Sequence, residues 1–337
     1  MNQPLTTLPP ALLPRLCDRH GRLDPQHIGW SSRPLLNYAL PGNPGRRKRW
    51  NHWCITTAQW SLSLVQADLD YVGYAAVYFL DLQTGQAYNH TQLRPFARGC
   101  HLPDTPLQSH EFVHPHLQIR VDEQPGRVRL SCAAPNIGGQ PLQVTLEITR
   151  PRHLESVNLV VPFAGRGFHA CSRQIGLPCT GSVQLGNRQY HCQNGQSFAA
   201  LDFGRGVWPF NSQWTRATFA APGGIAGNFG SGWTEHSGLS ENALWFGGEL
   251  LHLAQPVTIA GADQGALSPR RLSSADGRVD LLFTPHQQHL AAPRAGPLHA
   301  TTRQAFGRFD GNLRAPSGEW VPVNGAQGWI GQTVARW

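Results

Sequence analysis

The sequence predicts an all-β protein built from antiparallel β-barrels or strongly curved sheets, with few and short helices. Three observations predict this class. The 337-residue chain is rich in turn formers, with 36 Gly and 27 Pro, whereas charged residues make up only 14%. Segments of alternating polarity recur at short intervals, and helical periodicity is scarce. Many strands without helices to cover them favour closed or sandwiched sheets, because closure removes exposed sheet edges.

Alternating polarity locates the individual strands. In 142–149 (LQVTLEIT) apolar residues occupy every second position, which is the period of a strand with one buried face. Segments 117–121 and 127–132 alternate in the same way, and the intervening DEQPG supplies a turn. Segment 71–82 is apolar on both faces, so we expect it to lie centrally in a sheet.

Glycine-containing turns mark hairpins between these strands. In 241–253 (ENALWF-GG-ELLHL) the pair Gly247–Gly248 can adopt the positive φ angles of a tight turn, and 312–323 reads as a further hairpin. Helical turns are expected only in 7–17, where prolines limit them, and within 60–70.

A weak internal echo predicts a tandem architecture. From Trp50 the chain runs through strand-like sequence to a hairpin turn at Gly85, and from Trp214 it does the same to Gly248. Two related barrels account for the length of the chain. We therefore expect an N-terminal extended segment over 1–45, a first barrel over 46–198 and a second barrel over 199–337.

The net charge of +8 raises the question of a nucleic-acid partner. The one dense cationic run is Arg46-Arg47-Lys48-Arg49, and the other arginines are scattered singly. A nucleic-acid groove instead gathers its charge on one face. A solvated basic loop explains the run better, and binding of nucleic acid or an anionic surface through Arg46–Arg49 stays a second alternative.

Membrane, secretion and metal signals are weak. No segment has the length of an apolar membrane span, and the proline-interrupted N-terminal sequence is not of the signal-peptide type. Seven irregularly spaced cysteines are expected to be reduced thiols, in a cytoplasmic protein. His110, His114 and His116 lie close together, but 16 histidines produce such clusters by chance, so we expect no metal and no cofactor.

The stretch DFGRGVWPF (202–210) combines an acid, an arginine, a tryptophan and two glycines. Its first three letters match the magnesium motif of protein kinases, but the phosphate loop and strand lysine that this motif requires are missing. We expect Gly204 and Gly206 to make a bend at the start of the second barrel. A buried charge is costly unless it is paired. Asp202 and Arg205 are therefore expected to pair, with Trp208 facing a cavity.

Further polar residues lie within aromatic, glycine-rich strand sequence, and a catalytic acid or base can emerge from such a network. For each single residue a purely structural clamp is the alternative. The expected acids are Glu235, Glu241, Asp202 and Asp70, with His236 as a proton shuttle. The expected ligand-binding residues are Arg205, Trp208, Trp214, Trp233, Trp245, Asn242, Trp50 and Tyr74.

Several motifs together resemble one bacterial family. GRRKRWNHW, ADLDYVGYAAVYFLDLQTG, LDFGRGVWPF, SENALWFGGELLHL and FGRFDG resemble the family called domain of unknown function 2804, over roughly residues 20–337. A more distant similarity, in architecture, is to the lipocalin-like tandem barrels of carotenoid 1,2-hydratases and Diels–Alder-type cyclases, which hold hydrophobic substrates in a cavity. The family resemblance also predicts an acidic or histidine pair before the final Arg-Trp, where this chain has Gln332 and Thr333. If that pair performs acid–base chemistry in relatives, activity is altered or lost here.

These expectations lead to a protein that binds a hydrophobic, lipid- or terpenoid-like small molecule. It would act on this molecule without a cofactor, as a hydratase, isomerase or cyclase. A general acid would protonate a double bond, and aromatic faces would stabilise the developing carbocation. The first alternative is a non-enzymatic carrier of the same kind of ligand. The sequence leaves the oligomeric state open.

Overall fold

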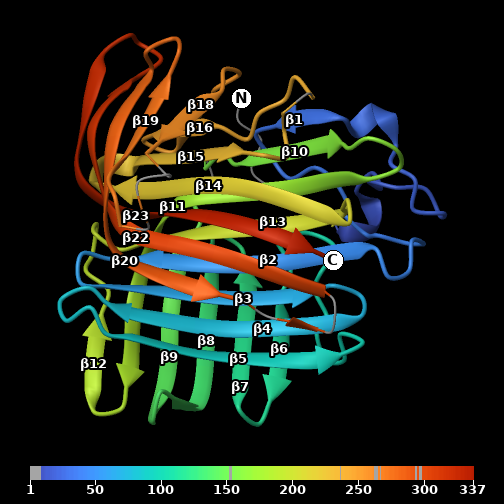
Figure 1. Ribbon diagram of the computed structural model, residues 1–337, viewed down its shortest axis with the longest axis horizontal. Helices are drawn as coiled ribbons and strands as arrows, with labels where there is room; N and C mark the ends of the chain where they lie inside the picture. The colour runs from blue at the N-terminus through green and yellow to red at the C-terminus, as the bar shows by residue number, and fades with distance from the viewer. Residues whose placement is uncertain are drawn as a thin grey trace. The chain divides into compact units, whose positions relative to one another are not determined.

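A computed structural model describes residues 9–151, 154–235, 237–261, 265, 267–292, 294–295 and 298–337. The chain divides into two compact units, Met1–Trp208 (unit 1) and Pro209–Trp337 (unit 2). Each unit is built on one strongly curved antiparallel sheet, as the all-β prediction requires (Figure 1). Among the described residues, helix is limited to short 3-10 turns at Pro10–Leu12, Pro25–His27 and Pro222–Gly224. No helix of the described ranges is long and apolar enough to cross a membrane.

Unit 1 contains a 13-stranded sheet in the order β5-β4-β3-β2-β13-β11-β9-β8-β7-β6, with β1, β10 and β12 attached at β10, β11 and β11. Its strands are β1 (Gly29–Ser31), β2 (Arg47–Thr56), β3 (Trp60–Asp68), β4 (Val72–Asp81), β5 (Ala87–Pro95), β6 (His110–His114), β7 (Leu117–Gln124), β8 (Arg127–Ile137), β9 (Gln140–Thr149), β10 (Val157–Pro162), β11 (Phe168–Leu185), β12 (Arg188–His191) and β13 (Phe198–Val207).

The long strand β11 bends the sheet of unit 1 onto itself. Its first half pairs with β10 and β13, and its second half pairs with β9 and β12, with a register shift between Gln174 and Leu177. Strands β2–β4 consequently cross β6–β9 at a steep angle (Figure 1). Such crossing places two inner faces against each other. Buried residues from both sets, such as Leu64 and Leu130, share one core.

The predicted patterns are confirmed in most strands of unit 1. Burial alternates along β7, β8 and β9, and β4 is buried on both faces. The helical turn expected within 60–70 is wrong. This segment is strand β3, because it pairs along its length with β2 on one side and β4 on the other.

Unit 2 contains a 10-stranded sheet in the order β17-β16-β15-β14-β23-β22-β20-β19-β18, with β21 paired to β22. The phenylalanines of its core pack against one another at tilted angles, with Phe219–Phe309 ring centroids 5.0 Å apart and Phe283–Phe309 centroids 4.7 Å apart. Its strands are β14 (Asn211–Ala221), β15 (Ile225–Ser231), β16 (Ala243–Phe246), β17 (Glu249–His252), β18 (Val257–Ala260), β19 (Arg270–Ser274), β20 (Val279–Ala291), β21 (Arg294–Ala295), β22 (Leu298–Arg314) and β23 (Trp320–Arg336).

The two sheets repeat one topology. Trp50 lies on β2 and Trp214 on β14, and each of these strands begins a four-strand meander, β2–β5 or β14–β17. Each first strand also pairs with the last strand of its own unit, β13 or β23. The Gly247–Gly248 turn joins β16 to β17 with positive φ at both residues, as predicted. The similarity between the sequence segments that begin at Trp50 and Trp214 thus corresponds to a repeated strand order.

The division between the units falls after Trp208, later in the chain than the expected join between residues 198 and 199. Strand β13 pairs along its length with β2 and β11, so it completes the sheet of unit 1 and does not begin the second unit. Gly204 and Gly206 lie inside this extended strand, so the expected bend is also wrong.

Candidate functional site

Asp202 is paired with an arginine other than the predicted one. Its carboxylate forms an ion pair with Arg173, which lies directly opposite on β11, and accepts a hydrogen bond of 3.0 Å from Trp50 Nε1. The expected pair of Asp202 with Arg205 is wrong. Residues three positions apart on a strand point to opposite faces of the sheet, so the two side chains diverge.

An aromatic cluster lies beside this ion pair. Trp50 stacks on His169 with ring centroids 4.9 Å apart, and Trp208 Nε1 donates a hydrogen bond of 3.1 Å to His169 Nδ1. Gly204 makes room for the indole of Trp50, because a Cβ atom at this glycine would lie 2.2 Å from it. The cluster therefore combines two predicted tryptophans with a histidine that the sequence analysis missed.

The alternation of side chains along a strand could have identified His169 and Arg173 as neighbours on one face. Both lie in FHACSRQ (168–174), four positions apart, and therefore on one face of β11. What the sequence did not supply was the pairing of β11 with β13, which brings this face beside Asp202.

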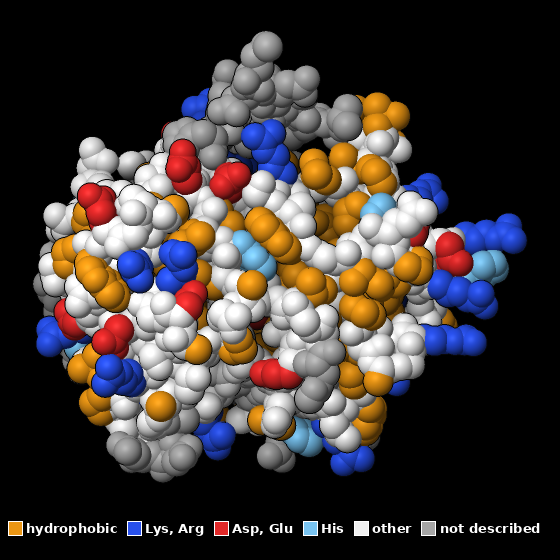
Figure 2. Space-filling model, turned by 90° about the horizontal axis from the view of Figure 1, so that it is seen from above, with side chains coloured by type: hydrophobic (Ala, Val, Ile, Leu, Met, Phe, Trp, Pro, Cys, Tyr) orange, Lys and Arg blue, Asp and Glu red, His pale blue; other side chains and the backbone are white. Residues whose placement is uncertain are grey.

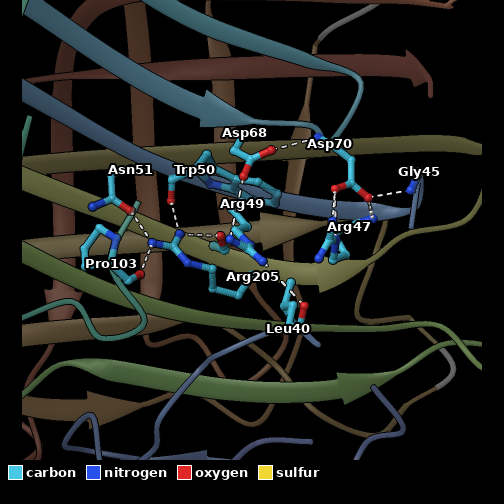
Figure 3. A network of polar contacts seen from close by, with 11 residues as sticks. Leu40, Gly45, Arg47, Arg49, Trp50, Asn51, Asp68, Asp70, Pro103 and Arg205 are labelled. Atoms are coloured by element: carbon cyan, nitrogen blue, oxygen red, sulfur yellow. Dashed lines mark hydrogen bonds and ion pairs between the residues drawn. The ribbon is translucent and has the colours of Figure 1, made fainter. Parts of the chain in front are cut away.

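Arg205 is fully buried and engages acceptors of the protein (Figure 3). Its Nη1 donates to the carbonyl oxygens of Trp50 (2.8 Å) and Gly204 (2.7 Å). Its Nη2 donates to Asn51 Oδ1 (2.9 Å) and to the Pro103 carbonyl oxygen (2.7 Å). Burial lowers the pKa of Arg205 well below its usual range. With both Nη groups engaged in this way, the arginine ties β2, β13 and the 103 segment together.

Asp70 closes the turn between β3 and β4. It has a left-handed φ of 77°, accepts a hydrogen bond of 2.5 Å from Gly45 N, and accepts others from Arg47, including one of 2.9 Å from Nε (Figure 3). Burial acts to raise the pKa of Asp70, but the hydrogen bonds and charge of Arg47 outweigh it and leave the pKa below its usual range. This carboxylate therefore acts as a clamp on Arg47.

The basic run Arg46–Arg49 is occupied by internal acceptors. Arg46 Nη2 donates to the Trp208 carbonyl oxygen at 2.5 Å, and Arg49 Nη1 lies 3.6 Å from the carboxylate of Asp68. Lys48 is fully buried with Nζ 3.3 Å from the Leu69 carbonyl oxygen, and burial lowers its pKa to about 8. On the face in Figure 2, basic side chains occur singly or in small groups among hydrophobic and acidic ones. These internal contacts disfavour a phosphate-binding strip.

The predicted histidine group does not come together in the structure, because His110 has contacts different from those of His114 and His116. His110 contacts Asn51 Nδ2 at 3.1 Å and the Gln108 carbonyl oxygen at 3.2 Å. Burial lowers the pKa of His110 to about 4. His114 and His116 face each other with ring centroids 5.4 Å apart. Within the described ranges, no group of three or more His, Cys, Asp or Glu side chains could hold a metal ion.

Three predicted residues of unit 2 meet at Gly230. Glu241 is 1% exposed, and its Oε1 accepts a hydrogen bond of 2.6 Å from Trp233 Nε1. The carboxyl group lies where a side chain of Gly230 would be, since a Cβ there would be 2.0 Å from Oε1. Asn242 Oδ1 accepts a hydrogen bond of 2.7 Å from Gly230 N. Trp233 thus holds the carboxyl group, and Gly230 provides the room for it.

A cation and an aromatic ring lie on the same face of this sheet. Arg216 on β14 is the cross-strand partner of Gly230, and its guanidinium lies 5.0 Å from the ring centroid of Trp329 on β23. Arg216 is 5% exposed and Trp329 is equally buried. Neither residue was predicted, although GWIG (328–331) places the Trp329 ring among glycines.

The remaining predicted acids and their neighbour do not join this group. Glu235 is exposed, and its Oε1 accepts a hydrogen bond of 2.5 Å from Gly232 N. His236 lies outside the described residues. At the C-terminal departure from the expected acidic or histidine pair, Thr333 Oγ1 lies 2.9 Å from Thr302 Oγ1.

The other predicted ligand-binding aromatics lie on three different strands. Trp214 on β14 stacks on Trp337 with ring centroids 5.6 Å apart, and Trp245 on β16 is 1% exposed. Tyr74 lies on β4, where burial raises its pKa against the opposing effect of a hydrogen bond with Thr91.

Comparison with known proteins identifies the family. The family model described as domain of unknown function (DUF2804) matches residues 9–337. The chain belongs to the DUF2804 family. The predicted resemblance is thereby confirmed for this DUF2804 protein. No curated protein matches its sequence.

Two solved structures share the fold of this DUF2804 protein. Kievitone hydratase from Nectria haematococca is similar with a TM-score of 0.56 and 13% identity, over 86% of this chain and 88% of that chain. A protein from Nitrosomonas europaea assigned as an AttH is similar with a TM-score of 0.51 and 12% identity, over 86% of this chain and 92% of that chain. This shared fold agrees with the predicted architectural similarity to lipocalin-like tandem barrels.

Proposed function

We propose that this DUF2804 protein binds a hydrophobic small molecule and protonates a carbon–carbon double bond in it, with Glu241 as the general acid. The observation that carries the proposal is the 1% exposed carboxyl group of Glu241, held by Trp233 Nε1 at 2.6 Å. A carboxyl group that is removed from water and fixed in position is suited to deliver a proton to a substrate.

The other predicted acids have different tasks. Asp70 binds Arg47, Asp202 binds Arg173, and Glu235 is exposed. The first two fit structural clamps, because removing either acid would leave a part-buried or buried arginine without its carboxylate.

Aromatic surface near Glu241 supports the same reaction class. A carbocation that forms after protonation is stabilised by the face of an indole ring. Trp233 touches the acid directly, and Trp329 lies on the same face of the sheet. Subsequent attack by water would give hydration, loss of a proton would give isomerisation, and attack by an internal double bond would give cyclisation. That kievitone hydratase shares the architecture supports the hydration branch.

Solvent deuterium tests the proposal. The protein is incubated in D₂O with kievitone and, separately, with geraniol. The masses of the recovered compounds are then measured by mass spectrometry. Protonation at carbon places deuterium in at least one of the two, and Glu241→Gln should reduce this incorporation by about a hundredfold or more. Glu249→Gln, on the exposed end of β17, is the matched control and should keep the wild-type rate.

The carrier alternative gives a different result in the same experiment. A carrier binds one of the compounds without deuterium incorporation, and its binding is unchanged in Glu241→Gln. Incorporation that is equal in Glu241→Gln and wild type would remove Glu241 from the acid role.

A further inference from the structure

Two cysteines of unit 1 face each other as thiols. Cys179 lies on β11, and Cys192 directly follows β12, with the two Sγ atoms 3.8 Å apart. Strand pairing explains the approach. Cys192 N donates to the Gly181 carbonyl oxygen at 2.9 Å, so Cys192 lies opposite Gly181 and on the same face as Cys179.

Gly181 has no side chain that could come between the two thiols. It has a φ of 110°, and a Cβ atom there would lie 2.3 Å from the Thr145 carbonyl oxygen, so no side chain fits. The thiol of Cys192 is therefore in contact with that of Cys179. Disulfide formation needs the two sulfur atoms to approach to about 2 Å. Because Cys192 follows the last residue of β12 and precedes a turn, it is the partner that can make this movement.

We propose that Cys179 and Cys192 are a redox-active pair that closes to a reversible disulfide when the protein meets a hydroperoxide. This proposal is independent of the function proposed for Glu241. Exposure distinguishes Cys192 from the other cysteines. Cys192 is half-buried and has the Cys179 thiol in contact, whereas Cys17, Cys54, Cys100, Cys132 and Cys171 are buried.

The two thiols have distinct roles in the reaction. The hydrogen bond with Cys179 lowers the pKa of Cys192, whereas the same contact and burial raise the pKa of Cys179. The thiolate is the nucleophile, so Cys192 reacts first and Cys179 second. Burial by contrast raises the pKa of Cys17 and Cys132 to about 12, which leaves these thiols unreactive.

The reaction balances as follows. The Cys192 thiolate attacks the outer oxygen of the hydroperoxide, the O–O bond breaks, and an alkoxide leaves and is protonated by water. Cys192 is then a sulfenic acid. The sulfur of Cys179 attacks the sulfur of Cys192, the S–O bond breaks, and the leaving hydroxide combines with the proton of Cys179 as water. The two thiols lose two electrons and the peroxide gains them. A small dithiol reverses the change by exchange.

Peptide mapping tests the pair in the full-length protein. Protein exposed to a small excess of hydrogen peroxide is freed of peroxide, unfolded in urea, alkylated with N-ethylmaleimide, digested and analysed by mass spectrometry. We expect a cross-linked peptide joining Cys179 to Cys192, two hydrogens lighter than the dithiol form and lost after dithiothreitol. Cys17 and Cys132 are the internal controls and should remain fully alkylated.

Single variants separate the two roles. In Cys179→Ser the sulfenic acid of Cys192 should persist and be trapped by dimedone, whereas in Cys192→Ser the thiol of Cys179 should stay unoxidised. Wild-type protein in which peroxide leaves both thiols free to alkylate, or oxidises Cys132 equally fast, would overturn the proposal. This readout needs no activity, so its failure leaves the role of Glu241 untouched.

Discussion

Arg205 fixes the orientation of the Asn51 side-chain amide. Asn51 Oδ1 accepts a hydrogen bond from Arg205 Nη2 (Figure 3). The amide nitrogen is therefore the atom that faces His110 Nε2, at 3.1 Å. An amide nitrogen is a donor only, and therefore His110 Nε2 must accept and cannot carry a proton. The proton of the neutral ring then lies on Nδ1, facing the Gln108 carbonyl oxygen.

This chain of contacts predicts acid sensitivity. The pKa of His110 is lowered to about 4, by burial first of all, whereas an unfolded histidine has a pKa near 6.5. Between about pH 6.5 and about pH 4 this histidine binds a proton in the unfolded chain but not in the folded chain. The free energy of unfolding therefore falls as the pH falls. We expect a loss of about 1–3 kcal/mol from this residue.

Urea unfolding at several pH values measures the effect. His110→Gln keeps an acceptor for Asn51 but does not titrate, so its free energy of unfolding should fall less than that of wild type across this range. Parallel curves for the two proteins would contradict the assignment.

Gly204→Ala should be destabilising although glycine lies in an ordinary strand. The new methyl group would lie 2.2 Å from the indole of Trp50, and overpacking of this kind costs about 1–3 kcal/mol. In a Trp50→Ala background the clash is removed, so the same substitution should cost little. A double-mutant cycle by thermal unfolding measures this coupling, and additive effects would exclude the contact.

Removing one partner of the ion pair between Asp202 and Arg173 should destabilise the protein. Asp202→Asn leaves the buried guanidinium of Arg173 without its carboxylate, and breaking such a pair costs about 3–5 kcal/mol. Combining it with Arg173→Met should recover part of the loss, as followed by chemical denaturation. If Arg205→Met recovered the loss instead, the predicted Asp202–Arg205 pair would be reinstated.

Arg205→Lys should also be destabilising despite the retained charge. Lysine has one ammonium group and cannot reach the carbonyl oxygens of Trp50, Gly204 and Pro103 together with Asn51. Each buried acceptor left without a donor costs about 1–3 kcal/mol. Arg127→Lys is the control, because its pair with Glu147 is exposed at 3.7 Å and contributes little. Calorimetry should show a lower Tm for the first variant only.

The sequence contained the fold class and most strands but not the long-range pairing. Alternation over 142–149 needs only local residues, so β9 was predictable. Segment 60–70 was misassigned because the alternation of residues 60–64 is interrupted at Val65, and its two neighbours in the sheet decide that it is a strand. The glycines of 202–210 suggested a bend, whereas Gly204 makes room for the Trp50 ring and Gly206 for the Phe168 carbonyl oxygen and the Trp208 ring.

In the candidate site, too, individual residues were predictable from the sequence but their partners were not. Glu241 and Trp233 were both predicted as functional residues, but their hydrogen bond depends on the turn between β15 and β16, which has no local signature. Arg173 was missed as the partner of Asp202, because their contact depends on the register between β11 and β13. The sequence shows which residues of one strand point to the same face. It does not show which residues of two paired strands lie opposite each other.

The pairing of β14 with β23 determines the order in which the chain can be completed during synthesis. In unit 2 the first strand, which begins at Asn211, has β15 as one neighbour and the segment Trp320–Arg336 as the other. One edge of the meander β14–β17 therefore stays open until that late segment has left the ribosome. An open strand edge is a template for wrong pairing. Unit 1, whose β2 meets β13 by Val207, can close its sheet while unit 2 is still being translated. Each half of this chain therefore keeps one edge of its first strand open during translation until its own last strand has emerged.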